Sequence, residues 1–204
     1  MKGQMFFLAS TIILIFVVSL IVSVRSPQIA RERRLMEATL EKRMLENFVR
    51  ETESIPTFLS TCPSSIADKI REFMNYSRMT IERKGVEFRS LVVSMISNST
   101  TSQLNVSVIN FLKDKKTVKL ELNTSVVQTE TDVVNDTGIW VVLFSITPGE
   151  YYTLKVNVTE DNYTKEVGIA TKAGRDVYTG FFDMKMISEN DVYAKESSVT
   201  FSFG

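Results

Sequence analysis

Few side chains in this chain are of the types that carry out catalysis or hold a metal ion. None of its 204 residues is a histidine, which removes the commonest general base and the commonest zinc ligand. The single cysteine, Cys62, can form no intrachain disulfide, and as a nucleophile it would lack its usual activating imidazole. We expect it to be either a small buried or loop residue or the site of an intermolecular disulfide.

Carboxylates are the other candidates for chemistry. Asp176, Asp183 and Asp191 could bind a cation, but nothing in their spacing places them near one another. The chain has no glycine-rich phosphate loop, no metal-ligand spacing and no nucleophile–base pair. Lys plus Arg and Asp plus Glu number 24 each, so the net charge suggests no nucleic-acid partner. The sequence therefore predicts a protein that is not an enzyme and that uses no cofactor and no metal.

The residues that do form a pattern are asparagines in the Asn-x-Ser/Thr motif, the acceptor for N-linked glycans. Seven of the ten asparagines lie in it: Asn75, Asn98, Asn105, Asn123, Asn135, Asn157 and Asn162. Three of them, Asn105, Asn123 and Asn157, occupy the polar side of an alternating strand, where a glycan would not enter the core. The set predicts glycosylation and an extracellular domain. The alternative is that these residues simply decorate a solvent-facing sheet.

One uncharged stretch determines how the rest of the chain is placed. Met5 to Val24 is twenty residues without a charge, and as a helix it would be roughly 30 Å long, the thickness of a bilayer's hydrocarbon core. We therefore expect residues 1–26 to form a transmembrane anchor. The stretch is longer than the apolar region of a cleaved secretory signal, which is about 7–15 residues. A retained single-pass anchor is the simpler interpretation.

Besides a cleaved secretory signal and a retained anchor, there is a third possibility, which depends on the residues just before this stretch, Lys2-Gly3-Gln4. A Lys-Gly pair ahead of Gln and a long apolar helix resembles the prepilin-type signal of archaeal pilin-like surface proteins. The resemblance implies that a membrane peptidase cuts after Gly3 and that Gln4 becomes the new N-terminus. It covers about the first 25 residues. It departs from bacterial pilins, because Leu8 occupies the fifth place after the cut and no acidic residue lies near the start of the apolar run.

Residues 27–98 read as a charged amphipathic helical region. In a first helix, over 29–52, one apolar stripe follows three- and four-residue spacings: Leu35, Met36, Leu40, Met44, Leu45, Phe48 and Val49. After a turn near Pro63, a similar pattern predicts a second helix over 65–96, with Gly85 as a weak point or a boundary. The two helices could form a hairpin that buries both stripes, or a stalk whose stripe needs a partner from another chain.

The polar segment 98–102 marks the expected domain boundary, beyond which the pattern changes to period two. Apolar and polar residues alternate in Leu104–Phe111, Val118–Asn123 and Tyr152–Val158, as in half-buried strands. Residues 139–146 are continuously apolar, as in a strand buried on both sides, and residues 147–150 (Thr-Pro-Gly-Glu) suit a type II turn. Several short strands predict an antiparallel β-sandwich over 103–204. The region around Trp140 and this turn is similar to immunoglobulin-like modules of prokaryotic surface proteins.

The sequence thus predicts an α+β protein with an N-terminal transmembrane helix, an amphipathic helical hairpin or stalk and a C-terminal antiparallel immunoglobulin-like β-sandwich. The positive-inside rule alone would place the large domain in the cytoplasm, because Arg25, Arg31, Arg33 and Arg34 follow the anchor. We give the sequons more weight. We expect a non-catalytic structural or interaction protein of a cell surface, archaeal and pilin-like, whose partners are the bilayer and other membrane or surface proteins, including copies of itself. The alternative is an accessory or receptor subunit that binds a membrane complex through its stalk.

Overall fold

The computed structural model describes residues 35–36, 38–59, 65–189 and 191–203, and these divide between two compact units. The units are Met1–Arg43 and Met44–Gly204, and each is described by itself. In the first, residues 38–43 are helical. The second contains all the strands described below.

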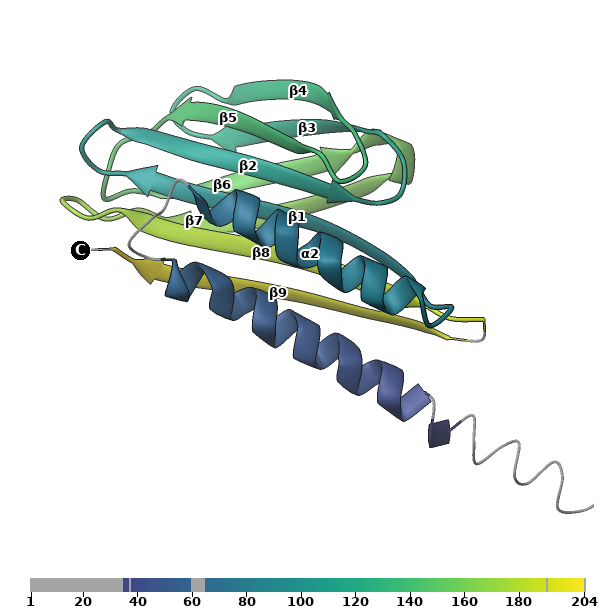
Figure 1. Cartoon of the computed structure of the whole chain (residues 1–204). Helices are drawn as coiled ribbons and strands as arrows, with labels where there is room; N and C mark the ends of the chain where they lie inside the picture. The colour runs from purple at the N-terminus through teal and green to yellow at the C-terminus, as the bar shows by residue number, and fades with distance from the viewer. Residues whose placement is uncertain (1–34, 37, 60–64, 190, 204) are drawn as a thin grey trace, which may run out of the picture. The chain divides into compact units, whose positions relative to one another are not determined.

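Within the described residues, nine strands form two antiparallel sheets. The five-stranded sheet has the order β5 (Ile139–Ser145), β2 (Gln103–Phe111), β1 (Glu87–Asn98), β8 (Val177–Ile187), β9 (Val192–Ser202). The four-stranded sheet has the order β4 (Gln128–Val134), β3 (Lys116–Asn123), β6 (Tyr151–Val158), β7 (Tyr163–Ala170), with the short 3-10 helix η2 (Thr159–Asp161) between β6 and β7. The sheets face each other, so the predicted β-sandwich is confirmed (Figure 1).

The core of the sandwich comes from strands that are buried on one side. In β3, Val118, Leu120 and Leu122 point inward, and the intervening residues form the outer face. The sequence alternation predicted this arrangement for β3, and also for β6, whose inward residues belong to the same cluster. The predicted turn at 147–150 is confirmed as well. The Glu150 N–H donates to the Thr147 carbonyl at 3.4 Å, and Gly149 has φ +97°, the left-handed value that position three of a type II turn requires.

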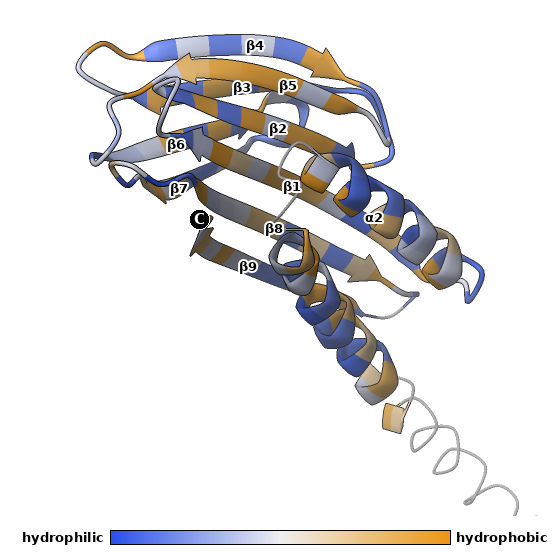
Figure 2. Cartoon of the chain, turned by 60° about the vertical axis from the view of Figure 1, so that its left-hand side comes forward, coloured by the Kyte–Doolittle hydropathy of each residue, from blue (hydrophilic) through white to orange (hydrophobic). Residues whose placement is uncertain are grey.

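A third layer, of helices, covers the outer side of the five-stranded sheet. Residues 44–58 are helical, and α2 (Ile66–Glu82) follows them. The buried stripe of α2, which includes Ile70, Met74 and Ile81, belongs to a second apolar cluster together with residues of the sheet. Figure 2 shows the apolar side of α2 turned toward the strands. The helices also touch each other, because the rings of Phe48 and Phe73 lie 6.3 Å apart.

The second predicted helix, over 65–96, is wrong in its C-terminal part. The helix ends at Glu82, and Gly85 adopts φ +78° in the turn that follows. Residues 87–98 are strand β1, which pairs with β2 on one side and β8 on the other. Strand β1 is buried on both faces, so its apolar residues do not alternate, and an unbroken apolar run can also be fitted to a helix.

Two further expectations need correction. The polar segment 98–102 is the turn between β1 and β2, where the Asn98 Oδ1 accepts the Thr100 and Thr101 N–H groups at 2.9 Å each. The last part of the region predicted to be helical over 27–98, residues 87–98, therefore belongs to the sandwich itself. Strand β5, expected to be buried on both sides, is an edge strand. Its Val141 and Leu143 side chains are 55% and 59% exposed.

The close packing of aromatic rings over Gly180 gives a test of the helix-covered side of the sheet. A Cβ at Gly180 would lie 2.6 Å from the Tyr178 hydroxyl oxygen and 3.0 Å from Phe182 Cζ. Both rings are fully buried, so relieving these contacts would displace packed side chains. We expect Gly180→Ala to lower the free energy of unfolding by about 1–3 kcal/mol. The measurement is urea unfolding of the full chain in detergent, followed by the fluorescence of Trp140, the chain's one tryptophan.

The control for this experiment is Tyr178→Phe. The Tyr178 hydroxyl is buried without a hydrogen-bond partner in the described structure, so removing it should be neutral or stabilising. It should also reduce the cost of Gly180→Ala, because the nearest clashing atom is gone. An equal cost in both backgrounds would contradict the proposed clash with the phenol.

Candidate functional site

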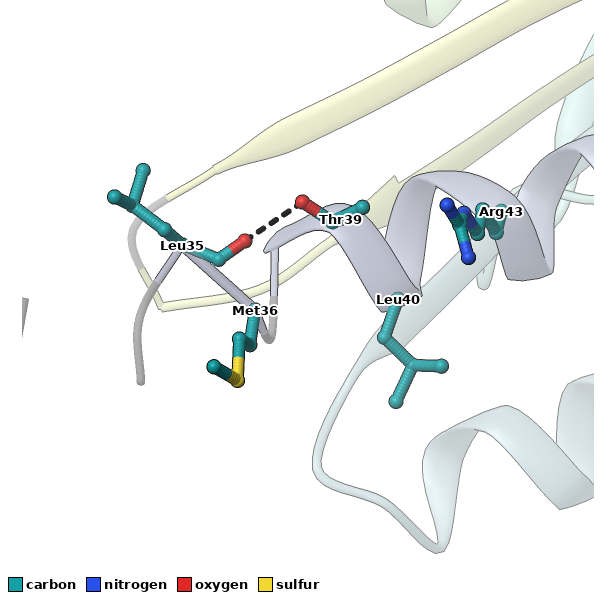
Figure 3. A pocket seen from close by; sticks show the side chains of 5 residues that line it. All are labelled: Leu35, Met36, Thr39, Leu40 and Arg43. Atoms are coloured by element: carbon teal, nitrogen blue, oxygen red, sulfur yellow. Dashed lines mark hydrogen bonds between the residues drawn. The ribbon is translucent and has the colours of Figure 1, made fainter. Parts of the chain in front are cut away.

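The most exposed apolar surface in the first unit lies on one side of its helical residues. Leu35, Met36 and Leu40 are 62%, 71% and 65% exposed. With Thr39 and Arg43 they line an open hollow of about 470 Å³ (Figure 3). The Thr39 hydroxyl donates to the Leu35 carbonyl at 2.8 Å, so it is satisfied within the helix and the hollow remains mainly apolar. We call Leu35, Met36 and Leu40 the exposed stripe.

The sequence predicted a single stripe from Leu35 to Val49, but its two ends have different surroundings. Leu45 and Val49 are buried in the second unit, in the cluster between the helices and the five-stranded sheet. Among the described residues of its own unit, which are 35–36 and 38–43, the exposed stripe has no such cover. Apolar residues on a protein surface that are this exposed and this close together are typical of a contact with another molecule.

The seven sequon asparagines lie in different elements, and the structure brings no two of them into one site. Four are exposed: Asn75 on α2, Asn123 at the end of β3, Asn135 in the turn after β4 and Asn162 after η2. Three are partly buried: Asn98, Asn105 and Asn157. Asn123 and Asn157 lie on the outer face of the four-stranded sheet, as the alternation predicted.

Asn105 is different, because the polar side of β2 is not the solvent side. Asn105 and Ser107 point to the side of the sheet that α2 covers, and Ser107 is buried. The Asn105 Oδ1 is buried as well and has no hydrogen-bond partner in the described structure. The expectation that a glycan on Asn105 would stand clear of a core is therefore wrong for this strand. The even-numbered residues of β2 face the sandwich core, and the odd-numbered residues face the helix layer.

The three aspartates are placed apart, each in its own surroundings. The N–H and hydroxyl of Ser99 donate to the Asp176 Oδ1 at 2.8 and 3.1 Å, and the Asp191 backbone carbonyl accepts the Ser188 N–H at 2.9 Å. Asp183 lies in β8 and is only 6% exposed. Among the described residues, no group of three His, Cys, Asp or Glu side chains could hold a metal ion.

Among the residues that the structure describes, Asp183 is the one buried carboxylate, and it faces charged groups from three strands. Its Oδ2 lies 3.9 Å from the Lys185 Nζ, and its Oδ1 and the nearby Tyr163 hydroxyl have no hydrogen-bond partner in the described structure. The ion pair of Lys165 on β7 with Glu196 on β9 lies alongside. Burial raises the pKa of Asp183 against the opposing charge of Lys185. An open hollow of about 360 Å³ is lined by Lys165 and Glu196, whereas Asp183 itself is not among the residues that line it.

Val141 and Leu143 are the surface residues that sequence reasoning missed. Their position in an unbroken apolar run predicted burial, whereas the strand order leaves the outer side of β5 uncovered. Strand order follows from long-range pairing, so no local signal in the sequence could have identified them. Several predicted features lie outside the described residues: the anchor over 1–26, the processing site at Gly3 and Gln4, and Cys62. Among the residues that are described, no helix has the length and apolarity needed to cross a bilayer.

We compared the chain with known proteins and found no match. Neither a protein-family model, nor a curated protein sequence, nor a solved structure matches this chain.

The buried carboxylate predicts how stability depends on pH. Because burial raises the folded-state pKa of Asp183 above its ordinary value of 3.8, the folded state binds this proton more tightly than the unfolded state. Its contribution to the free energy of unfolding is full below pH 3.8 and is lost as the pH rises through the raised value. We expect Asp183→Asn to be more stable relative to the wild type at pH 8 than at pH 4.

Urea unfolding of the full chain across this pH range measures the difference. The exposed residue Asp191 supplies the matched control, since Asp191→Asn should leave the wild-type profile unchanged. A constant offset between Asp183→Asn and the wild type at all pH values would contradict the predicted titration.

Proposed function

We propose that this chain is a single-pass membrane-anchored surface protein without catalytic activity, which associates with other membrane or surface proteins through its N-terminal helix. The observation that carries the proposal is the exposed stripe of Leu35, Met36 and Leu40. An apolar helix side that none of the described residues of its own unit covers is suited to a contact with another chain. The stripe follows closely on the predicted anchor over 1–26, so such a contact would form near the membrane surface.

The proposed extracellular location rests on the sequons. Four of the seven asparagines are exposed, which supports their accessibility to a glycosylating enzyme. The pilin-like variant of the proposal rests on Lys2-Gly3-Gln4, which resembles a prepilin-type signal. In that variant Gln4 is the N-terminus, and neighbouring apolar helices pack together with the sandwich outside.

The immunoglobulin-like character of the sandwich is also part of the proposal. Nine described strands in sheets of five and four match the number in variable-type immunoglobulin domains. The connectivity differs, because the first strand, β1, lies at the centre of the five-stranded sheet, and no solved structure matches. We therefore extend the likeness to strand number and layering and to nothing about ligands.

Mass spectrometry of the protein purified from its native membrane tests the location. We expect glycans at exposed sites such as Asn123 and Asn162, with Asn105 unmodified because its side-chain oxygen is buried on the helix-covered side of β2. A glycosylated chain that begins at Gln4 would support the pilin-like variant. A chain that retains Lys2-Gly3 but is glycosylated would leave an exported anchor without pilin-type processing. A chain unmodified at all seven sites would remove the argument for an extracellular domain.

Substitution in the exposed stripe tests the association. Replacing Leu35 and Leu40 by Gln removes apolar surface worth about 1.5–3 kcal/mol per buried leucine, so self-association should weaken at least about tenfold. Sedimentation equilibrium of the full chain in detergent measures the change. Folding should be unaffected, because both side chains are exposed in the isolated chain.

Glu41→Gln serves as the matched control, since it introduces the same residue next to the stripe without removing apolar surface. It should associate like the wild type. If the wild type is monomeric at all concentrations but the stripe variant loses binding to another membrane protein, the accessory-subunit alternative is favoured. If neither form of association depends on the stripe, the proposed role of this surface is wrong.

A further inference from the structure

The acceptor motif for N-linked glycans contains two functional side chains, the asparagine amide and the hydroxyl of the Ser or Thr two residues later. An enzyme that recognises this motif has to reach both side chains from one side of the backbone. In a strand, residues two apart point to the same side, whereas in an α-helix they are turned roughly 200° from each other. Exposure of the asparagine alone is therefore not sufficient to make a sequon an acceptor in the folded protein.

The sequon on α2 shows this difference most clearly. Asn75 is exposed, whereas Ser77, the hydroxyl residue of the same sequon, is 0% exposed. Ser77 belongs to the buried side of α2, which packs against β1 and β2. Its Oγ is buried and has no hydrogen-bond partner in the described structure. The helix therefore presents the asparagine to solvent and the hydroxyl to the sheet.

Two sequons expose both of their side chains. Asn123, the last residue of β3, is followed by the exposed Ser125 in the turn before β4. Asn162 follows η2 with φ +47°, and Thr164 is exposed on the outer side of β7. Each pair lies at a turn, where an enzyme can reach the amide and the hydroxyl together.

In each of the other four sequons, one side chain of the pair or both are buried or partly buried, and these sequons begin at Asn98, Asn105, Asn135 and Asn157. The Asn98 Oδ1 also accepts two N–H groups of its own turn. In the third of these sequons, the Thr137 N–H donates to the Asn110 carbonyl at 2.7 Å. Such contacts hold the groups in place, so these sequons are poorer acceptors than the two that expose both side chains.

We propose that N-glycans on the folded domain are confined to Asn123 and Asn162. Both lie at the four-stranded sheet near opposite ends of β6, because Asn123 pairs with Thr153 and Asn162 follows the end of β6. Figure 1 shows this sheet on the far side of the sandwich from α2. The bulky sugars would therefore stand on the four-stranded sheet, and the helix layer would stay free of them. The inference selects among the sequons and rests on the extracellular location proposed above.

Site-resolved mass spectrometry of the full chain from its native membrane tests this selection. A glutamate-specific protease cleaves after Glu160 and so places Asn157 and Asn162 on different peptides. We expect occupancy at Asn162 to exceed that at Asn75 by at least about tenfold, because the buried hydroxyl of the α2 sequon is reachable only when the helix opens locally. Equal occupancy at these two sites would overturn the inference.

Thr164→Ser supplies the matched control. Asn75 and Asn162 are both followed by a tyrosine, and their motifs differ only in having Ser77 in one and Thr164 in the other, so this substitution makes the two tripeptides identical. Thr164 is exposed, and its replacement should leave the fold intact. We expect Asn162 to keep its excess of glycan over Asn75. If the two occupancies become equal, the tripeptide and not the fold decides, and the inference is wrong.

Opening α2 should have the opposite effect at Asn75. Ile70 is 0% exposed on the buried side of this helix, so Ile70→Asp places a charge in the apolar cluster and should release the helix. Trypsin cleavage after Lys69 and Arg71 reports the opening. We expect occupancy at Asn75 to rise several-fold, and unchanged occupancy in the opened helix would overturn the inference.

The same spectra separate this inference from the proposed function. Glycans at Asn75 in the wild type at the level of Asn162 would leave the extracellular location standing and remove only the selection by the fold. A chain without glycans at any of the seven sequons would remove both.

Discussion

The burial of β1 on both faces is the constraint on which the rest of the structure depends. Leu91, Val93 and Met95 point into the sandwich core, whereas Phe88 and Val92 point into the cluster beneath the helices. A strand with two apolar faces is stable only between two other layers, because removing either layer would expose a row of large apolar side chains to water. The helices over the sheet are therefore part of the folded domain and not an added stalk. In the second unit, Leu45 and Val49 contribute to the same cluster.

The same constraint explains which parts of the fold could be predicted from the sequence. Strands with one buried side, such as β3 and β6, alternate and were identified with their inward residues. The turn at 147–150 was identified because Pro148 and Gly149 have specific conformational preferences. The sequence of β1 predicts a helix because its two buried faces remove the alternation. In β2 the alternation correctly predicts a strand but not its surroundings, since Asn105 and Ser107 lie on the helix-covered side of the sheet.

The candidate site was predictable only in part, for a related reason. The stripe from Leu35 to Val49 could be found from spacing, but the sequence cannot tell which half the domain uses for its own core. That depends on the sheet, whose strands are distant in the chain. Likewise, the apolar run over 139–146 is the same sequence whether its strand is central or at an edge. Strand β5 is at an edge because it pairs with β2 and with no other strand. For this reason Val141 and Leu143 are surface residues, although the apolar run predicts that they are buried.

The widths of the three layers account for the two uncovered ends of the five-stranded sheet. Five strands at about 4.8 Å span roughly 24 Å, whereas two helices at about 10 Å cover roughly 20 Å. The four-stranded sheet is narrower as well, so each end of the larger sheet extends past one neighbouring layer. At β9 the inward residues Glu196, Ser198 and Thr200 are polar, and that end can remain in water. At β5 the uncovered residues are Val141 and Leu143, which are apolar and exposed to solvent. A solvated edge favours polar residues, as at β9, whereas β5 keeps two exposed apolar side chains on its uncovered side.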